Sequence, residues 1–245
     1  MMTTTPSPAT TTDPELKGKA MHIEPGIVDG AKIVLSYVTA AGAGAYALHV
    51  ARKHLTERGA GSLLLGSAAT TVLTLAFFEV LPHFPVGVSE VHLILGSTLF
   101  LLFGAAPAAF GLALGLLIQG LVFAPFDLPQ YGMNVTTLLV PLFALQYVAH
   151  RAIAPKTRYI DLKYRQALAL SATYQAGIVS WVTFWALYGQ GFTAEAVGGI
   201  ATFGLAYMAV ILAEPLADLG VLAAAKTLPR FGDLTWLQPR LFSPA

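Results

Sequence analysis

Residues 93–124 read LILGSTLFLLFGAAPAAFGLALGLLIQGLVFA and contain no Asp, Glu, Lys or Arg. A transmembrane helix needs about 20 apolar residues, so this block is too long for one membrane crossing. Glycine and proline both weaken a helix interior, and Gly104-Ala105-Ala106-Pro107 places both near the middle of the block. We therefore predict two helices. The first, over residues 91–104, is short enough to need shielding by its neighbours.

The rest of the chain shows the same apolar character. The 245 residues are 56% hydrophobic and 11% charged, whereas soluble domains carry about 25% charged residues. Five more apolar stretches, the last of which contains Pro215, are residues 33–50, 63–81, 135–149, 168–187 and 196–225. The predicted fold class is therefore an all-α integral membrane protein with about seven transmembrane helices in one bundle. We expect the last helix to bend at Pro215.

The positions of lysine and arginine predict the orientation in the cell membrane. Basic residues cluster after the first, fifth and seventh predicted helices, which places all three clusters on one side. Short basic loops face the cytoplasm, so the C-terminus is predicted to be cytoplasmic. The N-terminal segment and residues 82–90, 125–134 and 189–195 then face outward. His22, His83 and His92 belong to the outward set, and His49, His54 and His150 are expected to be juxtamembrane polar residues on the inward side.

The composition also excludes several function classes. The chain has no cysteine, so any transition-metal site must use nitrogen and oxygen donors. It has no basic stripe with interleaved aromatic residues, which argues against nucleic acid as a partner. It also lacks the Gly-x-x-x-x-Gly-Lys-Ser/Thr phosphate-binding motif, so ATP hydrolysis would have to come from a partner.

The N-terminal region divides into two parts. Residues 1–20 are rich in Thr, Pro and Ala and contain no apolar run, so we predict a disordered extension, a cleaved segment or a start codon assigned too early. Residues 21–228 are predicted to form the membrane domain, which begins with the candidate metal-capture dipeptide Met21-His22 considered next, and residues 229–245 a cytoplasmic tail.

Met21-His22 can chelate a metal if Met21 carries a free amine. The terminal amine, the amide nitrogen of His22 and the His22 imidazole then close two adjacent chelate rings, and a fourth nitrogen completes a square plane. Square-planar nitrogen coordination suits Ni(II) or Cu(II), whereas zinc prefers a tetrahedron. Acylation of the Met21 amine by Ala20 would remove one donor. His92 is predicted to supply the fourth nitrogen, because an ionisable residue at an outward helix end is a functional candidate.

The order of the motifs resembles one family. Met21-His22 is followed by Ser89-x-x-His92 with a leucine and a glycine after it. Later come Gly104 with Pro107, the stretch Gln119-Gly120-Leu121-Val122-Phe123, and Gly132-Met133-Asn134. In this order they resemble the substrate-capture membrane subunits of cobalt/nickel energy-coupling-factor ABC transporters (CbiM/NikM-like), over about residues 21–225.

The resemblance implies a fold like that of the substrate-binding components of these transporters, with cobalt(II) or nickel(II) as the transported substrate. It implies Met21, His22 and His92 as metal ligands, and Ser89 and Asn134 as residues that orient the imidazoles or close loops over the metal. The implied partners are a transmembrane coupling subunit, cytoplasmic ATPase subunits and a small accessory membrane protein. The chain departs from the family at Tyr207, where histidine is usual.

Two other readings remain open from the sequence. His83, Glu90 and His92 could hold a zinc ion with an open position, as in a membrane-embedded metal-dependent hydrolase. A membrane scaffold without a ligand is the third possibility. The sequence does not distinguish cobalt from nickel, and it leaves the roles of Glu214 and Asp218 undefined.

Overall fold

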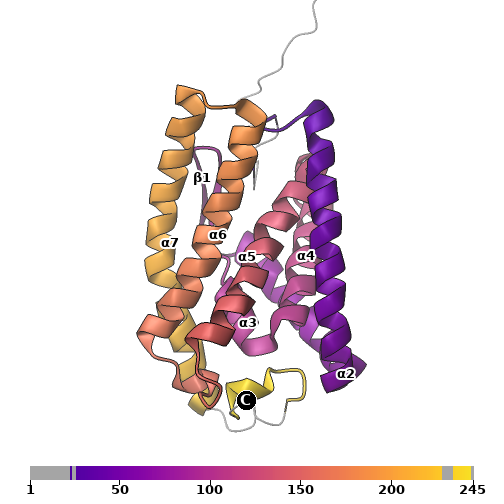
Figure 1. The fold of residues 1–245 in the computed structure, drawn as a ribbon, viewed down its shortest axis with the longest axis vertical. Helices are drawn as coiled ribbons and strands as arrows, with labels where there is room; N and C mark the ends of the chain where they lie inside the picture. Colours follow the sequence, from indigo (N-terminus) through magenta and orange to yellow (C-terminus); the bar gives the residue numbers. More distant parts are fainter. Residues whose placement is uncertain (1–22, 24–25, 228–233, 244–245) are drawn as a thin grey trace, which may run out of the picture.

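A computed structural model describes residues 23, 26–227 and 234–243 as one helical bundle (Figure 1). Within these residues lie six α-helices and one two-stranded hairpin, which confirms the predicted all-α membrane class. The elements are α2 (Ile33–Glu79), β1 (His83–Val86), β2 (Ser89–His92), α3 (Gly96–Phe103), α4 (Ala105–Val122), α5 (Tyr131–Ala152), α6 (Tyr164–Gln190) and α7 (Ala194–Thr227). Single 3-10 turns lie at Gly30–Lys32, Pro125–Gln130, Tyr159–Asp161 and Pro239–Leu241.

The helix α2 is a pair of helical arms joined at one residue. Gly59 has φ 81° and ψ 167°, a backbone conformation that glycine adopts without steric cost. The first arm packs on α5, where the rings of Tyr46 and Phe143 lie 4.6 Å apart. The second arm packs on α4, where the Thr70 hydroxyl donates to the carbonyl of Pro107 at 2.7 Å. The first two predicted helices are therefore present, but they extend through the expected loop to a turn at Gly59.

Close packing of the second arm on α4 depends on small residues. A Cβ atom added at Gly111 would overlap the side chain of Thr70, and one added at Gly115 would lie 2.6 Å from Thr74 Cγ2. These glycines recur at one-turn spacing on α4, so they let the two helix backbones approach along a continuous face. The bundle therefore uses this pair of glycines for internal packing.

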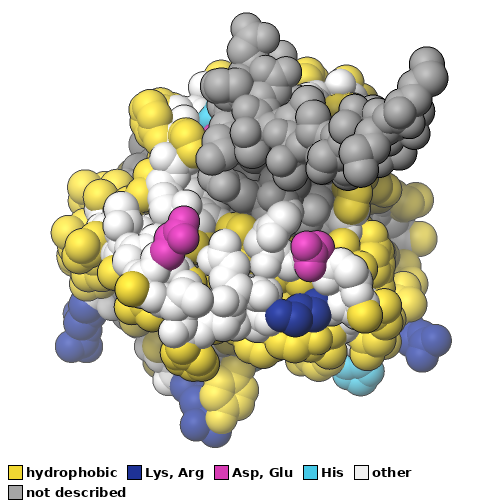
Figure 2. Space-filling model, turned by 90° about the horizontal axis from the view of Figure 1, so that it is seen from above, with side chains coloured by type: hydrophobic (Ala, Val, Ile, Leu, Met, Phe, Trp, Pro, Cys, Tyr) yellow, Lys and Arg dark blue, Asp and Glu magenta, His cyan; other side chains and the backbone are white. Residues whose placement is uncertain are grey.

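Several elements are long and apolar enough to cross a membrane. Within the described residues there are four such candidate spans: Gly30–Glu79, Ala105–Val122, Pro125–Ala152 and Ala194–Thr227. Seen from the end where α6 joins α7, hydrophobic side chains form much of the rim of the molecule (Figure 2). The chain is thus a multi-pass membrane protein, and the count of seven crossings stays a prediction.

The predicted start of the third helix, at residue 91, is wrong. The helix α3 begins at Gly96, and the residues before it form the antiparallel hairpin β1–β2, in which His83 pairs with His92. Gly87, with φ 67°, turns this hairpin and lies so close to the backbone of Gly199 on α7 that no side chain fits there. His92 is therefore on a strand, whose backbone pairs with that of β1.

The expected shielding of the short helix is confirmed. All residues of α3 except Leu102 are buried. At its end, the C-terminal segment 234–243 packs on the bundle: Arg58 donates to Gln238 Oε1 and to the carbonyl of Thr235, both at 3.0 Å. Leu241 is fully buried. The described part of the predicted tail therefore packs against the end of the bundle where the two arms of α2 meet.

We expect the loop between α6 and α7 to face outward and the loop after α5 to face the cytoplasm. The chain has no cysteine, so a single introduced cysteine is the only position of this chain that a thiol reagent can label. Phe192 and Lys156 are exposed positions in these two loops. An impermeant thiol reagent added to intact cells should label Phe192→Cys and leave Lys156→Cys unlabelled until the membrane is opened. The reverse pattern would overturn the orientation drawn from the basic residues.

Candidate metal-capture site

His92 is the last residue of β2 and lies at the end of the hairpin opposite its turn. Its side chain is buried, its ring meets Phe78 edge-on with centroids 5.3 Å apart, and it stacks on His83 at 5.4 Å. Glu90 Oε2 lies 3.2 Å from His92 Nε2. Carboxyl groups beside metal-binding histidines help to orient the imidazole ring, so Glu90 is placed to fix that of His92.

The segment that follows His22 enters the bundle. Ile23, the next residue, is 2% exposed, and its backbone N–H donates to Asn134 Oδ1 at 3.3 Å. Asn134 lies in the first turn of α5 and is itself buried. The side-chain amide of Asn134 thus anchors the backbone one residue after the predicted chelating dipeptide.

A small cavity of about 30 Å³ lies at this junction, a volume that matches the share of one water molecule in the liquid. Its polar wall comes from Ser89 on β2, Asn134 and Thr137 on α5, and Tyr207 on α7. The remaining lining side chains are apolar: Ile23, Ile94, Leu116, Leu138, Ile178, Val182 and Phe203. The Tyr207 hydroxyl forms a hydrogen bond with the backbone of His92, which ties the cavity wall to the strand that carries this histidine.

The predicted site residues divide into two groups. Met21 and His22 lie outside the described residues. Ser89 and Asn134 line one cavity together, whereas His92 is not among its lining residues: it lies three residues after Ser89, on the opposite face of the same strand. Their roles toward a metal stay predictions.

Sequence reasoning missed two contributors to this site. Glu90 was considered only as a zinc ligand of the hydrolase alternative, and its pairing with His92 depends on the strand, where alternate residues share a face. Tyr207 was noted as a lost histidine, yet its phenol reaches the backbone of His92. In a helical reading of residues 91–104 neither contact is visible.

The hydrolase alternative needs three converging ligands. Within the residues that the structure describes, no three His, Asp or Glu side chains are grouped so that they could hold a metal ion. His83 and His92 stack with an interplanar angle of 28°. The site therefore gives no support to a zinc centre built from His83, Glu90 and His92.

The fold and the site define a multi-pass helical membrane protein with a small buried cavity, to whose wall Ile23 contributes. In a comparison with family models, residues 22–229 match CbiM, the cobalt uptake substrate-specific transmembrane region. The chain belongs to this family, and it is a substrate-specific membrane component of cobalt uptake. No curated protein and no solved structure matches the chain.

Proposed function

We propose that this protein captures cobalt(II) or nickel(II) from the outward side for uptake driven by ATP hydrolysis in partner subunits. The proposed ligands are the amine of Met21, the backbone nitrogen and imidazole of His22, and the imidazole of His92. The observation that best supports this proposal is the position of Ile23, which is buried in the cavity wall and hydrogen-bonded to Asn134. Consecutive Cα atoms are about 3.8 Å apart, so Ile23 tethers the proposed chelate to the edge of the cavity.

The surroundings suit a desolvated metal ion. The Glu90 carboxyl group lies 3.2 Å from His92 Nε2, and a carboxyl group beside a metal-binding histidine helps to orient its ring. Binding at such a nitrogen chelate releases protons, because the metal displaces the hydrogens of the amine and amide. The nearby cavity is small and mostly apolar, which leaves little room for bulk water there.

The proposed partners are a transmembrane coupling subunit, cytoplasmic ATPase subunits and a small accessory membrane protein. An open groove on the outer surface supports docking of the coupling subunit against the first arm of α2. Small residues of this arm and larger aromatic and aliphatic side chains line it together: Thr39, Gly42, Ala43, Tyr46, Val140, Phe143 and Trp181. Gly42 and Gly44 have no neighbour within 4 Å of an added Cβ, so a partner helix could approach this arm closely.

Metal analysis of the purified protein tests this function. We expect about one cobalt or nickel ion per chain after removal of loosely bound metal, and loss of that ion when the N-terminal amine is acetylated. Retention after acetylation would point instead to a site made of side chains alone. A chain that never retains cobalt or nickel would contradict metal capture and favour the scaffold alternative.

A further inference from the structure

A second buried polar cluster lies on α7, away from the capture cavity. Glu214 and Asp218 are fully buried and lie one turn apart on the same face of this helix. The Ser97 hydroxyl donates to Asp218 Oδ2 at 2.7 Å, and the Thr98 hydroxyl donates to Asp218 Oδ1. These hydroxyls belong to the first turn of α3, so the end of the short helix faces the acidic pair.

The helix α6 completes the cluster. The Ser171 hydroxyl and Gln175 Nε2 both donate to Glu214 Oε2, at 2.7 and 2.8 Å, and the backbone N–H of Ser97 lies 3.4 Å from Glu214 Oε1. Three helices thus converge on two carboxyl groups inside the bundle. All the side-chain atoms directed at the pair from α3 and α6 are neutral.

The cluster lacks a positive charge. Within the described residues, no Lys or Arg side chain forms an ion pair with either carboxyl group. Ionised carboxylates inside a membrane are costly unless a cation pairs with them, and two of them one turn apart also repel each other. The pair therefore calls for a bound cation or protons.

An independent observation points to a cation. Gln175 is fully buried, and its carbonyl oxygen Oε1 has no hydrogen-bond partner, although the same amide group is fixed beside Glu214 through Nε2. A buried carbonyl oxygen without a donor costs free energy, and a metal ion would satisfy it. Together with the carboxylates it gives a set of oxygen donors, in contrast to the nitrogen donors proposed for capture.

The cluster and the capture cavity are joined by two segments. On α7, Tyr207 lines the cavity and Glu214 follows it by seven residues on the buried face, which is about 10 Å along the axis. Before α3, Ile94 lines the cavity and Ser97 contacts both carboxyl groups.

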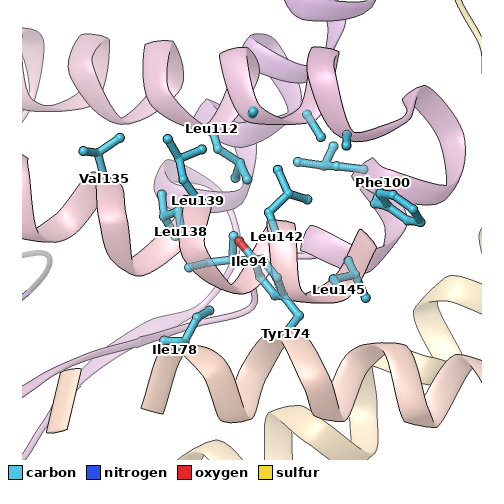
Figure 3. Close-up of a cluster of buried hydrophobic side chains, with 14 of the residues drawn as sticks. Ile94, Phe100, Leu112, Val135, Leu138, Leu139, Leu142, Leu145, Tyr174 and Ile178 are labelled. Atoms are coloured by element: carbon cyan, nitrogen blue, oxygen red, sulfur yellow. The ribbon is translucent and has the colours of Figure 1, made fainter. Parts of the chain in front are cut away.

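The Tyr174 side chain packs on the segment that joins these two regions. Its ring lies so close to Gly96 that no side chain fits there, and it reaches from α6 among Ile94 and Leu142 (Figure 3). Its hydroxyl is buried and has no hydrogen-bond partner. An aromatic side chain therefore lies beside the short stretch from Ile94 to Ser97.

We infer that Glu214, Asp218 and the carbonyl oxygen of Gln175 form a second divalent-metal site, which receives the metal after capture. This inference rests on the proposed function for the direction of transfer, whereas the site itself rests on the cluster. Oxygen donors hold cobalt or nickel less tightly than a nitrogen chelate does. A weaker second site suits transfer, since a transported ion must also be able to leave.

Manganese is a suitable probe, because Mn(II) favours carboxylate and carbonyl ligands. Full-length protein is stripped with a chelator and titrated with Mn²⁺, and free Mn²⁺ is measured by electron paramagnetic resonance. We expect one bound Mn²⁺ in the wild type, in His92→Ala, and in Glu195→Gln, which changes an exposed carboxylate of α7. The isosteric double variant Glu214→Gln, Asp218→Asn should bind Mn²⁺ at least tenfold more weakly.

The outcomes separate a metal site from a purely structural contact. Ser171→Ala removes one hydrogen bond to Glu214 and keeps every proposed ligand, so it should keep Mn²⁺ binding even if its unfolding temperature falls. If the double variant fails to fold, Asp218→Asn alone takes its place. Mn²⁺ binding that is absent from the wild type, or unchanged in the folded acid variants, would overturn the second site. Failure of capture would show separately, as cobalt retention that is unaffected by His92→Ala.

Discussion

We expect His22→Ala to abolish capture of cobalt or nickel, with a loss of affinity of about 100-fold or more. The substitution removes the imidazole and one of two chelate rings, and even the partners of metal ligands contribute 10- to 100-fold to affinity. His92→Ala should weaken binding to a similar degree, since it opens the fourth position. Calorimetric titration of the purified, chelator-stripped protein measures both effects.

Matched variants give this prediction its control. His150 is an exposed histidine at the end of α5, and His150→Ala should leave metal affinity unchanged. Glu90→Gln should give a smaller loss than His92→Ala, because it removes the charged partner of the ring while His92 remains. An equal loss in the His22, His92 and His150 variants would indicate misfolding or a different site.

The lengths of the apolar stretches in the sequence predicted most of the fold. The chain around Gly104 had to form two helices because one helix cannot hold so many apolar residues, and α3 and α4 meet there. The pair Gly111 and Gly115 is also readable as a close-packing face, and the threonines of α2 occupy the space that these glycines leave. Such features follow from local composition.

The hairpin could not be predicted in the same way. A short apolar run such as residues 91–95 fits a helix or a strand equally well. The choice is made by tertiary contacts, since Gly87 meets Gly199 on a helix more than 100 positions later in the chain. The hairpin then determines which residues surround His92. The approach of Ser89 and Asn134 to one cavity was predictable from the family resemblance, whereas the contacts of Glu90 and Tyr207 depend on the strand.

The position of Ile23 also bears on the N-terminus. Ile23 is 2% exposed and bonded to α5, and it comes two residues after Met21 in the sequence. The proposed chelate uses the amine of Met21, so it requires that amine to be free of an acyl group from a preceding residue.

A chain that begins at Met21 should bind cobalt or nickel at least about 100-fold more tightly than a chain forced to retain residues 1–20. In the longer chain the nitrogen of Met21 is an amide, whose lone pair is delocalised into the carbonyl group, so the metal loses one ligand. Removing a residue that only orients a ligand lowers metal affinity about 10- to 100-fold, and removing the ligand itself should lower it further. The shorter chain should also bind more tightly as pH rises from about 6 to 8, because its α-amine loses its proton near pH 7.7–8.0.

Two measurements decide this prediction. Mass spectrometry of the protein isolated from its native membrane identifies the first residue, and calorimetric titration of the two chains gives their affinities. A third chain that begins at Met21 and carries His22→Ala separates the amine from the imidazole: it should lose affinity although its amine is free. If the native protein retains residues 1–20 and binds metal as tightly as the shorter chain, the amine is not a ligand. The metal would then have to be held by His22, His92 and donors elsewhere, and the cobalt-uptake family assignment would still stand on residues 22–229.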